Sequence, residues 1–279
     1  MSSYRLNYSF RESDARDYTY SYSHQTNGIT ITKGTNTSNI NTNSNSNTYH
    51  LSSTSIPKKS IVVTTASLKI LDQGSLGSCV SNAISLSINI ITNNKINLSR
   101  LYLYFNGRAL GNQPLQEDNG LNIKDGVNSI VKYGLCSESV YPYDIQVFAK
   151  LPSLNVYKIA SYLPNFSYYF ITGNIINSLR SVLGTILTPV IFGAQIYSSF
   201  LTDTVAITGY VPIPDTLTET LEGGHCMTII GYDDNKKVFI CANSWGTSWG
   251  QKGLCYMPYD YIANNQLCSD FCVIRILKK

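Results

Sequence analysis

Cys79 is the residue of this chain whose type and position best suit a nucleophile. It follows Gly77 and Ser78, two small residues that would let a substrate carbonyl approach the sulfur closely. Apolar residues after it recur at helical spacing, so Cys79 opens a predicted helix. A helix N-terminus favours the thiolate, which is the form that attacks. An ordinary packed thiol is the alternative interpretation, and this stretch alone favours it.

A single histidine in the body of the chain could serve Cys79 as a base. His24 and His50 lie in a polar N-terminal region, whereas His225 immediately precedes an apolar run that predicts a β-strand. A lone histidine at a strand end is more often structural than catalytic. No other body histidine could activate Cys79, however, and such a base needs an orienting partner on its second ring nitrogen.

The segment CANSWGTSWG offers that partner. Asn243 follows a predicted strand, and its amide oxygen can accept a hydrogen bond from a histidine N–H. Both tryptophans of the protein, Trp245 and Trp249, lie just beyond it. An indole over the hydrogen bond would shield it from water. Taken alone, the motif is equally consistent with an aromatic corner of the core.

The elements that must position these residues form an α+β pattern. Helices are predicted from Cys79 to about residue 91, over 98–110 with Ser99 as N-cap, and over 122–134 with Gly134 as the stop. β-rich runs follow at 225–234, 236–245, 253–262 and 270–277. A helical half, about residues 70–150, therefore packs on a β-rich half, about residues 156–279, with a cleft expected between them.

Composition narrows the class of function. The chain has 279 residues, 43% of them hydrophobic, and a net charge of +4 carried by scattered basic residues. This pattern argues against a nucleic-acid or membrane partner. Seven cysteines without a metal-site spacing predict mostly buried, reduced thiols and no metal or other cofactor. Without a visible signal peptide or apolar span, an intracellular or virion-associated location is favoured over secretion.

Together, four motifs resemble the papain and cathepsin family of cysteine peptidases. They are DQGSLGSC, GVNSIVKYGLCSESVYPYD, GGHCMTIIGYDD and NSWGTSWGQKG, in the family's order and spread over most of residues 68–275. His225 follows Cys79 by 146 positions, within the family's spacing of roughly 130–150. The resemblance implies a papain-like two-subdomain fold, with the active-site cleft between a helical N-terminal half and a β-rich C-terminal half.

The resemblance also implies roles for individual residues. Cys79 would be the nucleophile, His225 the base and Asn243 its orienting partner, with Trp245 covering their contact. Gln73 matches the family's oxyanion-hole glutamine. The candidate substrate contacts are Asn119, Gly120, Gly224, Trp245 and Ser269, of which Ser269 would line the pocket for the second residue before the cut. Leu76 and Val80 depart from the family, which usually has a disulfide cysteine and an aromatic residue there.

The N-terminal region departs from the family pattern as well. Residues 1–55 are rich in Ser, Asn and Tyr, and precede the expected peptidase domain at 56–279. Tyr4, Leu6, Tyr8 and Phe10 alternate with polar residues, which predicts a short strand. Residues 21–55 cannot bury enough apolar surface to fold alone, so they need contact with the body. We interpret the region as an unusual pro-segment lying in the cleft, against the alternative of a simple tail.

The predicted function is therefore that of a cysteine endopeptidase, made as a zymogen, which hydrolyses polypeptide substrates through a thioester. A catalytically silent papain-fold protein with a binding or structural role is the alternative. A transferase or amidase using the same thioester is a weaker one. The presence of Cys79, His225, Asn243 and Gln73 together favours the enzyme.

Overall fold

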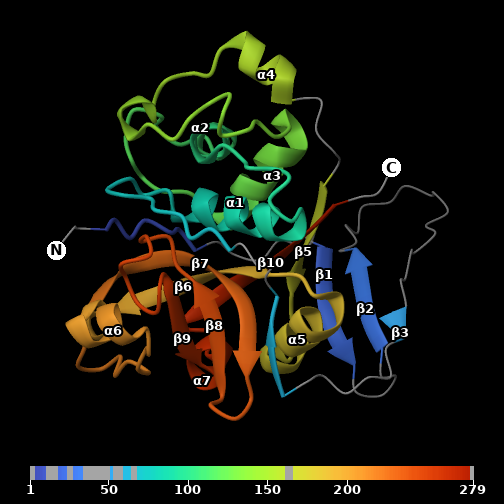
Figure 1. Ribbon diagram of the computed structural model, residues 1–279, viewed down its shortest axis with the longest axis vertical. Helices are drawn as coiled ribbons and strands as arrows, with labels where there is room; N and C mark the ends of the chain where they lie inside the picture. The colour runs from blue at the N-terminus through green and yellow to red at the C-terminus, as the bar shows by residue number, and fades with distance from the viewer. Residues whose placement is uncertain are drawn as a thin grey trace, which may run out of the picture.

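Helices α1 to α3 pack above one large sheet, as Figure 1 shows. The computed structural model describes residues 4–10, 18–23, 28–33, 51–52, 59–63, 68–160 and 166–276, and for 18–23, 28–33 and 51–52 only the backbone. The helices are α1 (Cys79–Ile91), α2 (Arg100–Leu110), α3 (Ile123–Tyr133), α4 (Leu154–Ala160), α5 (Ile175–Ser181), α6 (Asp203–Thr208) and α7 (Tyr259–Ala263). The protein thus has the predicted α+β architecture, with the helical half preceding most of the sheet.

Among the described residues, ten strands form the sheet. They are β1 (Tyr18–Ser23), β2 (Gly28–Lys33), β3 (Leu51–Ser52), β4 (Ser60–Val62), β5 (Phe166–Ile171), β6 (Val190–Tyr197), β7 (Leu221–Asp233), β8 (Val238–Ala242), β9 (Leu254–Pro258) and β10 (Cys268–Ile276). Their order is β3-β2-β1-β5-β10-β6-β7-β8-β9, with β4 also paired to β7. Every pair is antiparallel except β1 with β5.

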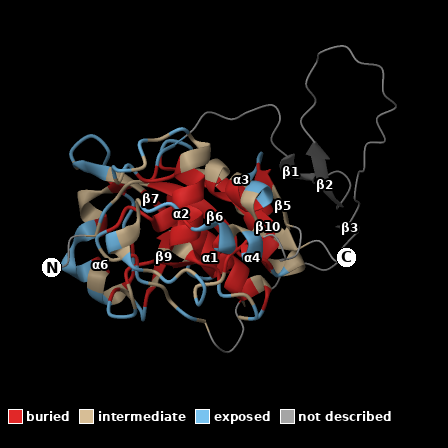
Figure 2. Ribbon diagram, turned by 90° about the horizontal axis from the view of Figure 1, so that it is seen from above, coloured by how far each residue is buried: buried red, intermediate tan, exposed pale blue. Residues whose placement is uncertain are grey.

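Helix α1 lies between the sheet and helices α2 and α3 (Figure 1), in the buried interior that Figure 2 shows in red. Twelve of its thirteen residues are buried, including polar ones. Three of these polar side chains form hydrogen bonds with backbone carbonyls: Ser81 Oγ and Asn82 Nδ2 donate to the Ser78 carbonyl, and Ser85 Oγ donates to the Leu98 carbonyl. Thr228 Oγ1 of β7 donates to the Ala83 carbonyl at 3.2 Å, which ties the helix to the sheet. Burial on all sides fixes the start of α1, where Cys79 lies.

The predicted helix caps are confirmed. Ser99 Oγ accepts from the Tyr102 amide at the start of α2, and Gly134, at φ 76°, ends α3. The predicted strand over 253–262 is wrong in its second half, because the chain turns at Pro258 into α7. The sequence pattern there could not distinguish a strand from a short buried helix, since Tyr261 and Ile262 are apolar in either case.

The N-terminal region meets the body at two places. Residues 4–10 are extended but form no strand, contrary to expectation; a single parallel bridge joins Tyr8 to Leu121. Further on, β1 and β2 form a hairpin whose β1 edge pairs with β5. The backbone of β1 and β2 is therefore joined to the large sheet through the pairing of β1 with β5. Residues 11–17, 24–27, 34–50 and 53–58 of this predicted segment lie outside the described part of the chain.

Candidate active site

Cys79 is the first residue of α1, at the interface of the helical and β-rich halves. Its side chain is completely buried. Burial raises the pKa of the thiol to about 11, while backbone groups of Cys226, Val80 and Asn7 oppose that rise. Contact with Cys226 places the sulfur beside β7, one residue from His225. Contact with Asn7 shows that the N-terminal segment lies over the sulfur.

His225 on β7 is held by Asn243, which follows β8. Asn243 Oδ1 lies 2.8 Å from His225 Nε2 and 2.7 Å from the Ser244 amide nitrogen. A backbone N–H can only donate, so the Asn243 atom that faces both groups is its oxygen. His225 Nε2 must then carry a hydrogen. Nδ1, which is buried with no hydrogen-bond partner among the described residues, is left to take a proton.

Trp245 covers this pair. Its ring lies 4.8 Å from that of His225, tilted by 33°, and is itself packed edge-on against Phe200 and Trp249. The enclosed imidazole is costly to charge, and its burial lowers the pKa of His225 to about 4, although the hydrogen bond with Asn243 opposes this. Both His225 and Cys79 are therefore neutral in this closed arrangement.

Gln73 joins the nucleophile loop to the loop that carries Asn243. Its Oε1 accepts from Ser244 Oγ at 2.7 Å, and its backbone amide donates to the Ser244 carbonyl. Its Nε2 donates to the carbonyl oxygens of Leu76, at 3.0 Å, and Arg5, at 3.1 Å. A carbonyl group of the N-terminal segment thus occupies the donor that the sequence suggested for an oxyanion.

Residues 4–8 run between the two halves and touch both (Figure 1). Tyr4 stacks on Trp245 with ring centres 4.8 Å apart, and its hydroxyl donates to the Trp245 carbonyl. The Tyr8 amide donates to the Gly224 carbonyl at 2.9 Å. At Gly120, where φ is +78°, a Cβ would lie 1.6 Å from the Asn7 carbonyl oxygen. The cleft walls are therefore bare backbone where the segment passes, and only glycine fits at Gly120.

Asp118 is a residue that the sequence analysis missed. Its carboxylate accepts from the Gly77 amide, two residues before Cys79, and from the Tyr104 hydroxyl. The same carboxylate pairs with Arg5 at 2.9 Å, and its backbone carbonyl accepts from Asn7 Nδ2. An aspartate in a polar loop gives no sequence signal of this kind, because all its partners are distant along the chain.

The remaining predicted residues differ in where they lie. Gly224 borders the N-terminal segment, and Ser269 lies near the Tyr8 side chain. The exposed side chain of Asn119 instead donates to Glu117 Oε2, so only its loop reaches the cleft. All seven cysteines are buried and free, in keeping with the leucine at position 76.

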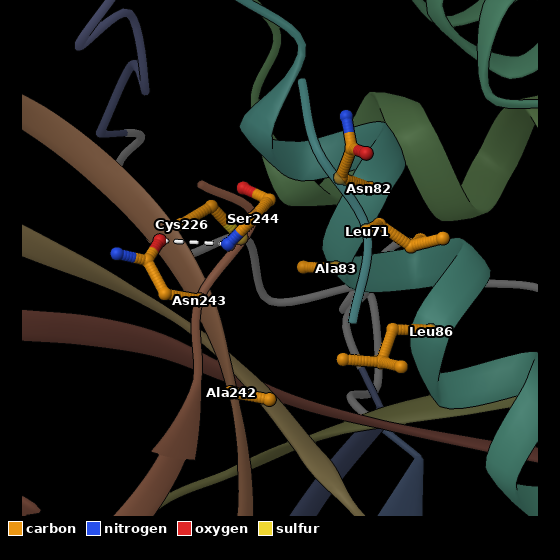
Figure 3. A pocket seen from close by; sticks show the side chains of 8 residues that line it. All are labelled: Leu71, Asn82, Ala83, Leu86, Cys226, Ala242, Asn243 and Ser244. Atoms are coloured by element: carbon orange, nitrogen blue, oxygen red, sulfur yellow. Dashed lines mark hydrogen bonds between the residues drawn. The ribbon is translucent and has the colours of Figure 1, made fainter. Parts of the chain in front are cut away.

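Figure 3 shows a hollow behind the site, between α1 and the ends of β7 and β8. It is lined by Leu71, Asn82, Ala83, Leu86, Cys226, Ala242, Asn243 and Ser244. Its volume of about 10 Å³ has room for a single water at most. It is a packing gap and lies apart from the path of residues 4–8.

Several known proteins resemble this chain in sequence and fold. Residues 56–269 match the papain family of cysteine proteases. A peptidase C1-like protein of Acanthamoeba polyphaga mimivirus is 34% identical over 82% of this chain and 79% of its own length. Cysteine proteinase 3 of Dictyostelium discoideum is 28% identical over 67% of this chain and 54% of its own. The crystal structure of xylellain, a cysteine protease from Xylella fastidiosa, superposes with a TM-score of 0.78 at 27% identity, covering 99% of this chain and 98% of that one.

The fold and these matches define a papain-like cysteine protease, which is a hydrolase. This chain belongs to the papain family of cysteine proteases.

Proposed function

We propose that this protein is a cysteine endopeptidase that cleaves polypeptides through a thioester, and that residues 4–8 keep it closed as a zymogen. The observation that carries the catalytic part is the state of His225: Asn243 holds Nε2, and Nδ1 is free on the strand residue next to Cys226, which contacts Cys79. With Nε2 bound to Asn243, His225 can accept a proton only at Nδ1, and the donor that we assign to it is the Cys79 thiol.

In the proposed reaction, His225 Nδ1 takes the proton of Cys79 and the thiolate sulfur attacks the substrate carbonyl carbon. The oxyanion binds Gln73 Nε2 and the Cys79 amide, as the segment leaves. The C–N bond then breaks, and the amine departs with the proton from His225. Water, deprotonated by His225, hydrolyses the thioester, which returns the thiol and releases the carboxylic acid.

The zymogen part rests on occupancy of the cleft. The Arg5 carbonyl engages Gln73, Asn7 contacts Cys79, and Tyr4 covers Trp245. A peptide substrate needs these same groups, so it can enter only when the segment leaves. In this closed arrangement, burial of the sulfur raises the pKa of the Cys79 thiol and favours its protonated form, since desolvation disfavours the thiolate.

The test is labelling of the full chain with an epoxide thiol reagent, together with hydrolysis of a fluorogenic peptide. We expect one label per chain, on Cys79, and loss of hydrolysis in step with labelling. Cys79→Ala should abolish both, while Cys136→Ala, a change at another fully buried thiol, should preserve both. Labelling without any hydrolysis would support a catalytically silent papain-fold protein instead. Hydrolysis that persists in Cys79→Ala would refute the mechanism.

A further inference from the structure

Tyr143 belongs to the motif GVNSIVKYGLCSESVYPYD but takes no part in the proposed reaction steps. It lies in the loop between α3 and α4. Its hydroxyl donates to the Gln73 carbonyl at 2.9 Å, and the hydroxyl oxygen lies 2.5 Å from Ser78 Oγ. Gln73 carries one donor proposed for the oxyanion, and Ser78 precedes Cys79, whose amide is the other. A single hydroxyl therefore joins the two chain segments that supply these donors.

The direction of every hydrogen bond in this group follows from its two ends. At one end, Arg100 Nη1 lies 3.1 Å from an Asn82 side-chain atom, which must be the amide oxygen because a guanidinium can only donate. Asn82 Nδ2 then donates to Ser78 Oγ at 3.0 Å. At the other end, the Gln73 carbonyl can only accept, so it takes the Tyr143 hydrogen. Ser78 Oγ must therefore donate to the Tyr143 oxygen, and these groups form one directed chain.

Arg100, the first residue of α2, supports this chain from the side. Its guanidinium carbon lies 3.7 Å from the centre of the Tyr143 ring. The guanidinium also donates to the Asp72 carbonyl at 2.9 Å and pairs with Glu138 at 2.8 Å. Because Arg100 is itself held by these partners, the Tyr143 ring rests on a fixed planar cation, and its hydroxyl has a defined position.

Ser78 is the N-cap residue of α1, yet its side chain does not cap the helix. A serine at this position ordinarily accepts a hydrogen bond from one of the first helical amides. Here its Oγ is engaged by Asn82 and Tyr143 instead, so it takes up none of those amides. Backbone groups of Cys79 and Val80 favour the thiolate at the Cys79 sulfur. The chain thus gives up a helix cap at the point where an oxyanion donor lies.

We propose that Tyr143 is a positioning residue, whose hydroxyl holds Gln73 and the start of α1 in the arrangement that forms the oxyanion hole. The inference rests on the proposed function and adds to it a residue outside the reacting groups. Tyr143→Phe keeps the ring over Arg100 and removes only the hydroxyl, so the two donors lose the link between them. Misplacement by about 1 Å can cost roughly 10²-fold in rate, so attack on a carbonyl should slow while the thiol stays reactive.

The experiment compares two reactions of Cys79 in the full chain. Hydrolysis of a fluorogenic peptide passes through an oxyanion. Labelling by dithiodipyridine does not, because the thiolate attacks a sulfur, forms a mixed disulfide and releases pyridinethione. Labelling of Cys79 is measured as the difference from Cys79→Ala. The N-terminal segment lowers both rates by the same open fraction, so this fraction cancels from the ratio of kcat/KM to the labelling rate.

We expect this ratio to fall roughly 10- to 100-fold in Tyr143→Phe. Tyr141→Phe is the matched control, because it removes a hydroxyl of the same loop that donates to the Lys150 carbonyl, and it should keep the wild-type ratio. A merely structural role of Tyr143 would change folding or opening, which alter both rates together. A wild-type ratio in Tyr143→Phe would therefore overturn the proposal and leave the proposed function intact.

If the wild type cleaves no peptide although Cys79 is labelled, the proposed function fails, and a peptide aldehyde tests Tyr143 separately. The Cys79 sulfur adds to the aldehyde carbon, and the thiol proton passes to the carbonyl oxygen, which occupies the same hole. Affinity is measured as protection of Cys79 from labelling. Relative to the labelling rate, it should fall roughly 2- to 12-fold in Tyr143→Phe, the effect of one hydrogen bond. Equal affinity would refute the role of Tyr143, and a Cys79 that neither reagent reaches would refute both proposals.

Discussion

Removing the Tyr4 side chain should open the cleft by an amount that the structure allows us to estimate. The ring stacks on Trp245 at 4.8 Å, nearly parallel at 10°, and its hydroxyl donates to the Trp245 carbonyl at 2.9 Å. An aromatic pair contributes about 0.5–1.5 kcal/mol, and a hydrogen bond contributes a similar amount. Tyr4→Ala should therefore shift the opening equilibrium by about 1–3 kcal/mol, or roughly 5- to 150-fold.

The assay is the second-order rate at which an epoxide thiol reagent labels Cys79 in the full chain at pH 7. The reagent reaches the sulfur only in the open form, so the rate follows the open population. Tyr4→Phe keeps the stack and loses the hydrogen bond, so its rate should rise only roughly 2- to 12-fold. Tyr210→Ala, which removes a tyrosine stacked on Tyr256 elsewhere, should leave the rate unchanged. Labelling of Tyr4→Ala at the wild-type rate would refute the view that this contact closes the site.

Three further outcomes are expected. Gln73→Ala should lower kcat by roughly 10²–10³-fold through loss of an oxyanion donor. Ser244→Ala breaks only the hydrogen bond to Gln73 Oε1, so kcat in the same peptide assay should fall far less. Asn243→Ala should lower kcat/KM by roughly 10- to 100-fold, because the His225 N–H loses its acceptor; an unchanged value would show that Asn243 does not orient His225. The pKa of His225 is lowered to about 4, so the unfolded chain binds its proton first as pH falls, and stability present above pH 6.5 is lost towards pH 4. Urea unfolding at pH 6.5 and at pH 4 measures this loss of stability. The loss should be about 3 kcal/mol smaller in His225→Gln than in the wild type.

The sequence predicted those features whose signals are local or were supplied by family resemblance. Cys79 opening a helix followed from periodicity, and the cap at Ser99 from its residue type. The limits of prediction from the sequence appear at Asp118 and Asp270. Asp118 pairs with Arg5, and Asp270 accepts a hydrogen bond from the Tyr8 hydroxyl; both partners lie more than a hundred positions away. No residue pattern predicts the shift of register between Ser269 and Cys272, where Asp270 lies.

The sequence also did not predict where the N-terminal region lies on the body. The polar composition of residues 21–55 predicted dependence on the body; in the structure, β1 pairs with β5 and β2 pairs with β1, through backbone groups that carry no side-chain signature. The alternation at Tyr4, Leu6 and Tyr8 predicted a strand. In the structure these residues form no strand and instead contact the cleft: Tyr4 with Trp245, Leu6 with Gly223 and Tyr8 with Asp270.

The closed state at Cys79 has a chemical consequence apart from inhibition. Peroxide oxidises a thiolate, and oxidation beyond the sulfenic acid is generally irreversible. A sulfur that is enclosed, with its pKa raised to about 11, has a thiolate fraction on the order of 10⁻⁴ at pH 7. If residues 4–8 keep the enzyme closed as we propose, they also protect the reduced sulfur from oxidation. On this proposal, the same five-residue stretch that delays catalysis also determines how long the protein can wait in an oxidising environment and still become an enzyme.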